Sequence, residues 1–407
     1  MRAASPLIAG DTGRVAGTLP AVSRWRGRVV LAEDVLVPPG ARLTVEAGTR
    51  IAAEYEASPG LLGERFGFGE RRALESAGRC HLIVAGRLDV EGSAERPVSI
   101  ASGSWGGIFV LDSGRAFLRH AELAPVPGGF GVKCLDFGRL RASFCRFSGG
   151  EGGVACGAFA AASLRDCSFS GAGRAAVWVH DDARAALARC SISGSRTGLV
   201  VQGLGRLRLR GNRIAGNERG ALFSDWARVR GSSQAWEDNA TAISLQGGAR
   251  LSLSRDLFRA NDLGLECLGN SRALLDGVSA EANVTAVWSQ NEASLSLDRS
   301  AFSRNDVGLR GSHRTRLRVA DSVFAGHRKA GMLVEDRAGA VVKGASFQRN
   351  LNGLMALHRS GIDARRCRLS GSRDTAVWRD HRARARLANC DFRDNFRDAQ
   401  SAARPAE

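Results

Sequence analysis

The 407-residue sequence predicts an all-β protein, a single-stranded parallel β-helix (solenoid) with about 22 residues per coil, because two columns of residues repeat at that period. The first column keeps a constant step of 22 residues and consists of Asn217, Asn239, Asn261, Asn283, Asn305 and His327. The second column lies three positions ahead, with steps of 22 or 23 that are doubled where Ala280 interrupts it. Its members are Phe147, Phe169, Ile192, Ile214, Trp236, Phe258, Phe302, Phe324, Phe347, Leu369 and Phe392. A fixed step in this range is typical of stacked repeats.

One coil, LVVQGLGRLRLRGNRIAGNERG at residues 199–220, indicates what each repeat folds into. Leu207 and Leu209 alternate with arginines, so the two kinds of side chain point to opposite faces of a short strand. Gly and Asn then break the alternation twice, which predicts tight turns rather than helices. Three short strands per coil fit a parallel β-helix. A leucine-rich repeat of similar length would need an LxxLxLxxN frame, and that frame is absent.

The two columns also predict what holds successive coils together. Stacking makes a continuous core of Phe on Phe and Leu on Leu, in which an aromatic pair adds about 0.5 to 1.5 kcal/mol beyond burial. The Asn column should form a ladder whose side-chain amides bond to the coils on either side, as in other cross-β stacks.

Changes in the pattern suggest three segments. Residues 1–83 are expected to form an N-terminal cap and the first coils; 29–51 alternate apolar and polar positions, and 54–80 lose the pattern and read as a flap. Residues 84–396 are the β-helix repeats, and 397–407 are a frayed tail or short cap. The exposed strand edges at the ends of such a solenoid suggest end-to-end self-association.

The charge is strongly basic and uneven. The sequence has 58 basic and 41 acidic residues, a net charge of +17. Residues 301–407 contain 22 basic and 11 acidic residues, a net of +11. A basic end attracts nucleic acid, anionic lipid or acidic polysaccharide, although no specific nucleic-acid motif is present. The alternative is that arginine only fills solvent-facing strand positions and protects exposed strand edges.

The cysteines and the first residues of the sequence bear on the cellular compartment of the protein. The nine cysteines include a repeat column of Cys145, Cys167 and Cys190, and we expect them to be free, buried packing residues rather than disulfides or metal ligands. No stretch of 18 apolar residues would span a membrane. The first residues lack an apolar signal-peptide core, which as written predicts a cytoplasmic protein.

Three segments carry a family resemblance. DVLVPPGARLTVEAGT, HLIVAGRLDVEGSAERPVSI and SWGGIFV resemble the opening of bacterial right-handed parallel β-helix repeat proteins, and residues 108–395 resemble the pectin-lyase-like solenoid of that superfamily. The resemblance implies a right-handed β-helix over nearly the whole chain. It implies little about function, because the fold includes lyases, hydrolases, epimerases, adhesins and proteins of unknown role. It also implies a cell-surface or periplasmic location, in conflict with the start of the chain.

One predicted corner contains the strongest candidate site. His313, Asp336, His358 and His381 follow each other at steps of 22 or 23, so they should lie on consecutive coils and could serve as acid and base. Each is followed by an arginine that could bind an anionic ligand, namely Arg314, Arg337, Arg359 and Arg382. The alternative is a solvated ladder without function.

Two further carboxylates, Asp181 and Asp182, follow His180 and could act in acid–base chemistry. Asp181, however, falls in the same turn column, where Gly203, Gly247 and Gly269 indicate a structural turn. The polygalacturonase elements Asn-Thr-Asp, Gly-His-Gly and Arg-Ile-Lys are absent.

The sequence predicts no metal site and no cofactor. Calcium is expected only if the protein is a lyase.

Two functions remain open at this stage. The first is a non-catalytic scaffold or binding protein that contacts an acidic polysaccharide or a protein partner through an Arg-rich face. The second is a polysaccharide lyase or epimerase that acts on a polyuronate. The missing motifs favour the first.

Overall fold

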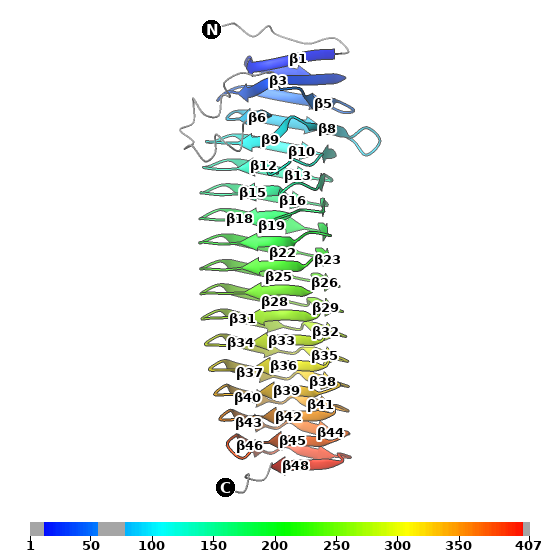
Figure 1. Cartoon of the computed structure of the whole chain (residues 1–407), viewed down its shortest axis with the longest axis vertical. Helices are drawn as coiled ribbons and strands as arrows, with labels where there is room; N and C mark the ends of the chain where they lie inside the picture. Colours follow the sequence, from blue (N-terminus) through cyan, green and yellow to red (C-terminus); the bar gives the residue numbers. More distant parts are fainter. Residues whose placement is uncertain (1–11, 56–77, 402–407) are drawn as a thin grey trace. The chain divides into compact units, whose positions relative to one another are not determined.

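The structure, a computed structural model, describes residues 12–55 and 78–401, which form 48 β-strands and no α-helix. The chain divides into two units, residues 1–207 (unit 1) and 208–407 (unit 2), and the boundary falls within β22 (Arg206–Arg210). Each unit is a parallel β-helix. A typical turn consists of a five-residue strand of sheet A, a strand of sheet B and a three-residue strand of sheet A (Figure 1).

Sheet B receives one strand from each turn. In unit 1 its strands are β2 (Val22–Trp25), β4 (Arg42–Glu46), β7 (Arg87–Glu91), β10 (Arg115–Arg119), β13 (Arg139–Ser143), β16 (Ala161–Arg165) and β19 (Arg184–Ala188). In unit 2 they are β25 (Arg228–Ser232), β28 (Arg250–Ser254), β31 (Arg272–Asp276), β34 (Ser294–Asp298), β37 (Arg316–Ala320), β40 (Gly339–Lys343), β43 (Gly361–Arg365) and β46 (Arg384–Ala388). With β22, the described residues therefore form about 16 turns.

Sheet A receives the remaining strands. In unit 1 these are β1 (Thr12–Thr18), β3 (Arg28–Val37), β5 (Arg50–Ala53), β6 (Cys80–Val84), β8 (Val98–Gly103), β9 (Trp105–Val110), β11 (Ala121–Leu123), β12 (Phe130–Cys134), β14 (Arg146–Ser148), β15 (Gly152–Cys156), β17 (Ser168–Ser170), β18 (Val177–Val179), β20 (Ser191–Ser193) and β21 (Thr197–Val201).

In unit 2 they are β23 (Arg213–Ala215), β24 (Arg219–Phe223), β26 (Ala235–Glu237), β27 (Thr241–Leu245), β29 (Leu257–Arg259), β30 (Leu263–Cys267), β32 (Ser279–Glu281), β33 (Thr285–Ser289), β35 (Ala301–Ser303), β36 (Val307–Gly311), β38 (Val323–Ala325), β39 (Ala330–Val334), β41 (Ser346–Gln348), β42 (Asn352–Ala356), β44 (Arg368–Ser370), β45 (Thr375–Arg379), β47 (Asp391–Arg393) and β48 (Arg397–Ser401).

The predicted apolar column is confirmed in both units. Phe147 pairs in register with Phe169 in unit 1, and their rings stack with centroids 4.7 Å apart. In unit 2 the Phe324 ring lies 5.0 Å from the ring of Phe302 and 5.0 Å from that of Phe347. These side chains are buried, so the core of each unit is a stack of like residues.

The predicted asparagine ladder is confirmed in unit 2. The Nδ2 of Asn217 donates to Oδ1 of Asn239 at 3.0 Å, and the same bond links Asn239 to Asn261 at 3.1 Å and Asn261 to Asn283 at 2.9 Å. The amides of Asn239, Asn261 and Asn283 also donate to the preceding turn, as Asn261 Nδ2 does to the Trp236 carbonyl at 3.0 Å. Because these amides are buried, the bonds to both neighbours fix the stacking register.

Strand β36, which lies beside the ladder, needs a small residue at Gly308. A Cβ on Gly308 would lie 2.5 Å from the Gly331 carbonyl oxygen and 2.9 Å from the Phe324 ring. The backbone must therefore approach the next turn closely at this corner, which glycine allows.

The cysteines behave as predicted. All nine are free, and every one except Cys390 is buried. They fill the core as small apolar side chains.

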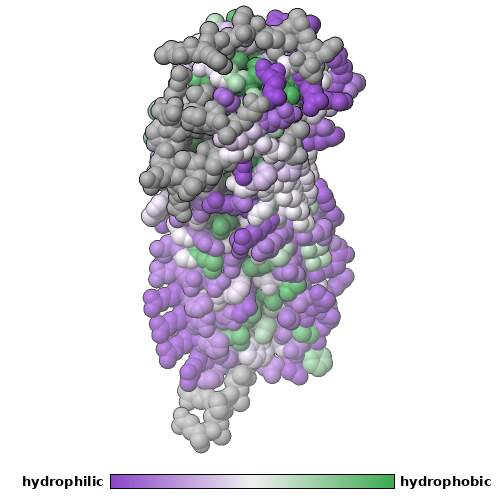
Figure 2. Space-filling model, turned by 45° about the horizontal axis from the view of Figure 1, so that its top comes forward, coloured by the Kyte–Doolittle hydropathy of each residue, from purple (hydrophilic) through white to green (hydrophobic). Residues whose placement is uncertain are grey.

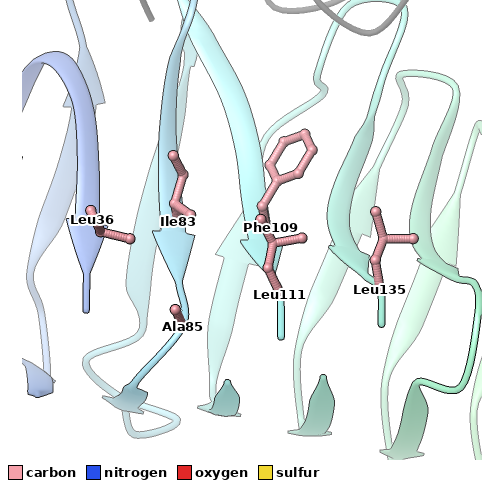
Figure 3. Packing of buried hydrophobic residues seen from close by; sticks show 6 residues of the cluster. All are labelled: Leu36, Ile83, Ala85, Phe109, Leu111 and Leu135. Carbon is pink, nitrogen blue, oxygen red and sulfur yellow. The ribbon is translucent and has the colours of Figure 1, made fainter. Parts of the chain in front are cut away.

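The first turns differ from the predicted alternation over 29–51. Strand β4 alternates, but β3 is buried on both faces from Val29 onward, apart from Glu33, which is half-buried. Figure 3 shows Leu36 on β3, Ile83 on β6 and Phe109 on β9, with Ala85, Leu111 and Leu135 beyond the strand ends, in one buried cluster. Strands buried on both faces read as continuous apolar runs, which explains the sequences VLV, LIV and IFV.

The ends of the chain bear on the predicted segments. Within the segment expected to form a cap and the first coils, residues 12–53 form β1 to β5, and within the segment expected to be a frayed tail or a short cap, 397–401 form β48. The flap predicted at 54–80 lies almost wholly outside the described residues.

One ladder position is imperfect. His327 takes the place of an asparagine, and its Nδ1 accepts the Asn305 backbone N–H at 3.2 Å, while its Nε2 has no hydrogen-bond partner. Burial lowers the pKa of His327 to about 4, and its hydrogen bonds offset this only in part.

We predict that His327 makes stability fall in acid. Below pH 6.5 the unfolded chain binds a proton here that the folded chain does not bind until about pH 4. Between these values the free energy of unfolding should fall by at most about 3 kcal/mol. His327→Asn should restore the ladder and flatten this dependence, measured as urea midpoints by circular dichroism from pH 7 to 4.5. His358→Asn is the exposed control, and equal slopes in all three proteins would contradict the assignment.

A second buried group has the opposite effect. Asp256 accepts the Gln234 backbone N–H at 3.1 Å, whereas its Oδ2 has no partner. Burial raises its pKa to about 7, although the hydrogen bonds it accepts act against the rise.

We predict that Asp256 makes stability fall as pH rises. Between pH 3.8 and 7 the unfolded chain loses this proton while the folded chain keeps it, at a cost of at most about 4 kcal/mol by pH 8. Asp256→Asn keeps an acceptor for Gln234 and removes the charge, so its urea midpoint at pH 8 should exceed that of the wild type. The gain should vanish near pH 4. An equal gain at both pH values, or in the exposed variant Asp262→Asn, would argue against burial of the charge as the cause.

Candidate functional site

The outward face of sheet B in unit 2 carries two columns of side chains. The first strand position holds, turn by turn, Arg228, Arg250, Arg272, Ser294 and Arg316, which pair in register. The position two residues later holds Arg230, Ser252, Leu274, Ser296 and Arg318. The residues between them point into the core, so both columns face solvent.

These columns form the floor of a groove of about 1240 Å³. It crosses β25, β28, β31, β34 and β37, which lie in successive turns (Figure 1). Four steps between paired strands give it a length of about 19 Å. One rim consists of the turn residues that precede each strand, namely Trp226, Gly248, Asn270, Glu292 and Arg314.

The groove is strongly cationic. Seven arginines and one carboxylate, Glu292, line it. Arg314 lies 3.8 Å from Glu292, and among the described residues the other six arginines form no ion pair.

Arginines elsewhere on the described surface are often paired. In unit 1 the first arginines of the same column, Arg42 and Arg87, both bind Asp89 at 2.6 and 2.8 Å. In unit 2 Arg213 and Arg259 share Glu237. Unneutralised arginines also stand opposite one another elsewhere on this sheet, as Arg115 and Arg139 of unit 1 do, for which the described residues supply no ion pair. The groove is therefore the part of a basic face in which seven arginines gather.

Two apolar side chains interrupt this charge. Trp226 is 64% exposed at one end of the groove, and Leu274 is 57% exposed in its floor. A Cβ on Gly248 would lie 2.7 Å from the Trp226 ring, so the glycine lets the ring lie against the next turn. An exposed ring and an apolar floor beside cations suit a ligand with both apolar faces and anionic groups. Figure 2 shows one face of the molecule, on which hydrophilic residues predominate and hydrophobic residues gather in smaller patches.

The predicted histidine column lies on consecutive turns and bonds within itself. The His313 backbone N–H donates to Asp336 Oδ2 at 3.1 Å, and His358 Nδ1 lies 3.2 Å from Asp336 Oδ1. His313, Asp336 and His358 all have positive φ, which is the conformation of the turn-forming position. Side chain to backbone bonds between turns thus account for this column structurally.

The last turn of that column contains a further carboxylate beside His381. Asp380, not His381, accepts the His358 backbone N–H, and it also accepts those of Arg382 and Ala383. Burial alone would raise the pKa of Asp380, but these hydrogen bonds lower it overall. His381 and Arg382 are exposed beside it.

The other predicted residues are also placed. In unit 1 Asp181 has positive φ and accepts the Ala158 backbone N–H at 3.1 Å, while its Oδ2 lies 2.8 Å from His180 Nδ1; Asp182 is exposed. Of the four predicted ligand-binding arginines, Arg314 lines the groove; Arg337, Arg359 and Arg382 do not.

Sequence reasoning missed most of the groove. The signal was present, because arginine recurs at a step of 22 residues at 206, 228, 250 and 272. The sequence leaves open whether these arginines bind a ligand or only fill solvent-facing positions, because it does not show which arginines find a carboxylate on a neighbouring turn.

Comparison with protein families decides the classification. The model of the right-handed β-helix region matches residues 130–235 and 229–369, which together span 240 of the 407 residues. The chain belongs to this right-handed β-helix family. A search of curated proteins finds no significant match.

Comparison with solved structures gives matches of low sequence identity. One is the A-module of mannuronan C-5 epimerase AlgE4 from Azotobacter vinelandii, with a TM-score of 0.44, 11% identity and coverage of 89% of this chain and 91% of that one. The periplasmic alginate epimerase AlgG has a TM-score of 0.44 and 8% identity, with coverage of 92% of this chain and 78% of that one. A tailspike protein of E. coli bacteriophage HK620, solved with a pentasaccharide, has a TM-score of 0.44 and 13% identity, with coverage of 86% of this chain and 72% of that one. These similarities concern the path of the backbone.

No group of three or more His, Cys, Asp or Glu side chains within 12–55 and 78–401 is arranged to hold a metal ion. No helix in the same ranges is long and apolar enough to cross a membrane.

Proposed function

We propose that this β-helix protein is a non-catalytic binding protein that holds an acidic polymer, an acidic polysaccharide, in the groove on sheet B of unit 2. The observation that carries the proposal is the row of six arginines without carboxylate partners in one groove. Guanidinium groups bind carboxylates and sulfates through two parallel hydrogen bonds. A chain of anionic groups laid along the turns would meet a guanidinium at nearly every step.

The apolar contacts favour a sugar polymer over a simple polyanion. Trp226 and Leu274 offer apolar surface to the ring faces of sugars, whereas an inorganic polyanion would gain nothing from them. The floor hydroxyls of Ser252 and Ser296 can hydrogen-bond to sugar hydroxyls.

This proposal also revises the location expected from the start of the sequence. Acidic polysaccharides are encountered chiefly outside the cytosol, so we propose a periplasmic or extracellular location in place of the cytoplasmic one.

Removing two central arginines should weaken binding. Each exposed arginine contributes roughly 0.5 to 1 kcal/mol to an ionic contact, so Arg250→Ala with Arg272→Ala should raise the Kd for polygalacturonate about tenfold. The affinity of the wild type should also fall as salt rises from 50 to 300 mM, because exposed charges are screened. Isothermal titration calorimetry measures both.

The matched control is Arg304→Ala with Arg328→Ala. These arginines lie in unit 2 outside the groove and are paired with Glu281 and Asp306, so the double variant loses the same number of cations. Its Kd should stay within twofold of wild type. Equal weakening in both double variants would show that net charge, not the groove, binds the polymer.

The catalytic alternative has a direct test. Proton NMR of alginate and pectate incubated with the protein, with and without calcium, would detect unsaturated ends, new reducing ends and C5 inversion. A binding protein leaves all three signals absent. A time-dependent change that is lost in His358→Ala or His381→Ala would instead establish a lyase or epimerase and its site.

A further inference from the structure

Two phenylalanine side chains of unit 1 lie exposed on the turns that lead into sheet B. Phe137 is 62% exposed and Phe159 is 60% exposed, and their rings stack with centroids 5.4 Å apart and an angle of 10° between the planes. Each stands two residues before a strand of the sheet, β13 or β16. The phenylalanine column of the core is buried, whereas exposed apolar groups that gather in one place typically mark a binding surface.

The backbone holds both rings in place. The Phe137 N–H donates to the Asp112 carbonyl at 2.9 Å, and the Phe159 N–H donates to the Asp136 carbonyl at 2.9 Å. Asp136 also accepts the Asp112 N–H through its Oδ2 at 3.3 Å, so the successive turns are bonded to one another. Because these turns are already ordered, a ligand that binds the rings does not have to order a loop.

The direction in which the rings stack limits what they can bind. Their centroid distance is close to the spacing of about 4.8 Å between paired strands, so the stack runs from turn to turn and the ring planes lie across this direction. One face of each ring covers the other ring. The free faces point along the stack, towards the neighbouring turns, where Ser113 and Asp182 occupy the same position. Neither residue is aromatic, so these residues leave both ends of the stack open to a flat group.

The three strands beside the rings are cationic. Strands β10, β13 and β16 lie in successive turns (Figure 1), and together they contain five exposed arginines and no carboxylate. Among the described residues none of the five forms an ion pair. The turns before these strands contribute Asp112 and Asp136, so five positive and two negative charges leave a net charge of +3. The five arginines are Arg115, Arg119, Arg139, Arg141 and Arg165.

A third ring on this face holds one of the cations. The guanidinium carbons of Arg87 and Arg141 lie 4.8 and 5.8 Å from the centroid of the Phe117 ring. Arg87 also binds Asp89, whereas Arg141 has no carboxylate partner among the described residues. The cation–π contact therefore places an unneutralised guanidinium on β13, in the same turn as Phe137.

We propose that this face of unit 1 binds single-stranded nucleic acid, with bases stacked on the free faces of Phe137 and Phe159 and phosphates bound by the arginines of β10 and β13. The bases of a strand lie across its direction. A strand that runs along the turns therefore presents its bases parallel to the two rings, and its phosphates follow the row of guanidiniums. Every base has a flat aromatic face, so binding should not depend on the nucleotide sequence.

The same geometry disfavours a polysaccharide on this face. The sugar rings of an extended polysaccharide lie along the chain, so they would meet only the edges of the two phenyl rings. The proposed site also shares no residue with the groove of unit 2, and it does not depend on the function proposed for that groove.

Removal of the two rings should weaken this binding. The wild type should bind a fluorescein-labelled dodecamer of thymidylate, and Phe137→Ala with Phe159→Ala should raise its Kd at least about tenfold, because two bases lose their stacking partners. Fluorescence anisotropy at 100 mM salt measures both. The matched control, Phe144→Ala with Phe396→Ala, removes two other exposed phenyl rings and should leave the Kd within twofold of that of the wild type.

A strand without bases separates stacking from charge. A dodecamer of abasic deoxyribose phosphates has the same charge as the thymidylate, so attraction to a basic protein alone would bind both strands equally. The wild type should bind the abasic strand at least about tenfold more weakly, and the Phe137→Ala, Phe159→Ala variant should bind the two strands within twofold of each other.

The outcomes distinguish this site from the groove. Failure of the wild type to bind the thymidylate, equal binding of both strands, or an unchanged Kd in the phenylalanine variant would overturn the nucleic-acid site. The Kd of that variant for polygalacturonate should stay within twofold of the wild-type value, and a tenfold rise would assign the two rings to polysaccharide binding instead. Failure of the wild type to bind polygalacturonate would overturn only the function proposed for the groove.

Discussion

The stacking register is the constraint on which the rest of the structure depends, and in unit 2 buried amides hold it. The amides of Asn239, Asn261 and Asn283 each donate to the asparagine of the following turn and to a carbonyl of the preceding turn. Leaving one such buried group without a partner costs about 1 to 3 kcal/mol, so a slip of one residue between turns would be penalised at many positions at once. The apolar column and the small residues of the corner strand require that same register, because Phe324 must lie between Phe302 and Phe347 and the close approach at Gly308 leaves no room for a Cβ.

The groove is a consequence of this register on the outer surface. Residues 22 apart face each other across sheet B, so a residue type repeated at that step becomes a continuous line of side chains. The backbone beneath this line of side chains is rigid. Binding therefore costs less conformational entropy than the ordering of a flexible loop would. The function we propose therefore needs no dedicated domain, since it arises from outward positions that the core leaves free to vary.

Most of the fold could be predicted from the sequence because each column repeats one kind of residue with a single structural role. Asn217 to Asn305 and the phenylalanine column gave the period, the strands and the ladder correctly. The continuous apolar runs of β3, β6 and β9 were harder, since alternation fails where a strand is buried on both faces. The groove could not be predicted in the same way. The gathering of seven arginines in one groove becomes visible only after five turns are placed in register, and whether Arg250 has a carboxylate partner depends on side chains of other turns.

The unneutralised arginines also have a cost that supports a binding role. Like charges directly opposite each other on neighbouring strands destabilise a sheet, and Arg228, Arg250 and Arg272 stand opposite one another on three successive strands. In unit 1 a carboxylate offsets this cost where Asp89 lies between Arg42 and Arg87, whereas Arg115 and Arg139 stand opposite each other without an ion pair among the described residues. A surface with no function would gain stability from a similar carboxylate in the groove. A bound polyanion supplies that missing charge, and because it binds the folded chain it also stabilises the fold by mass action. Stability and ligand binding are thus linked through the same side chains.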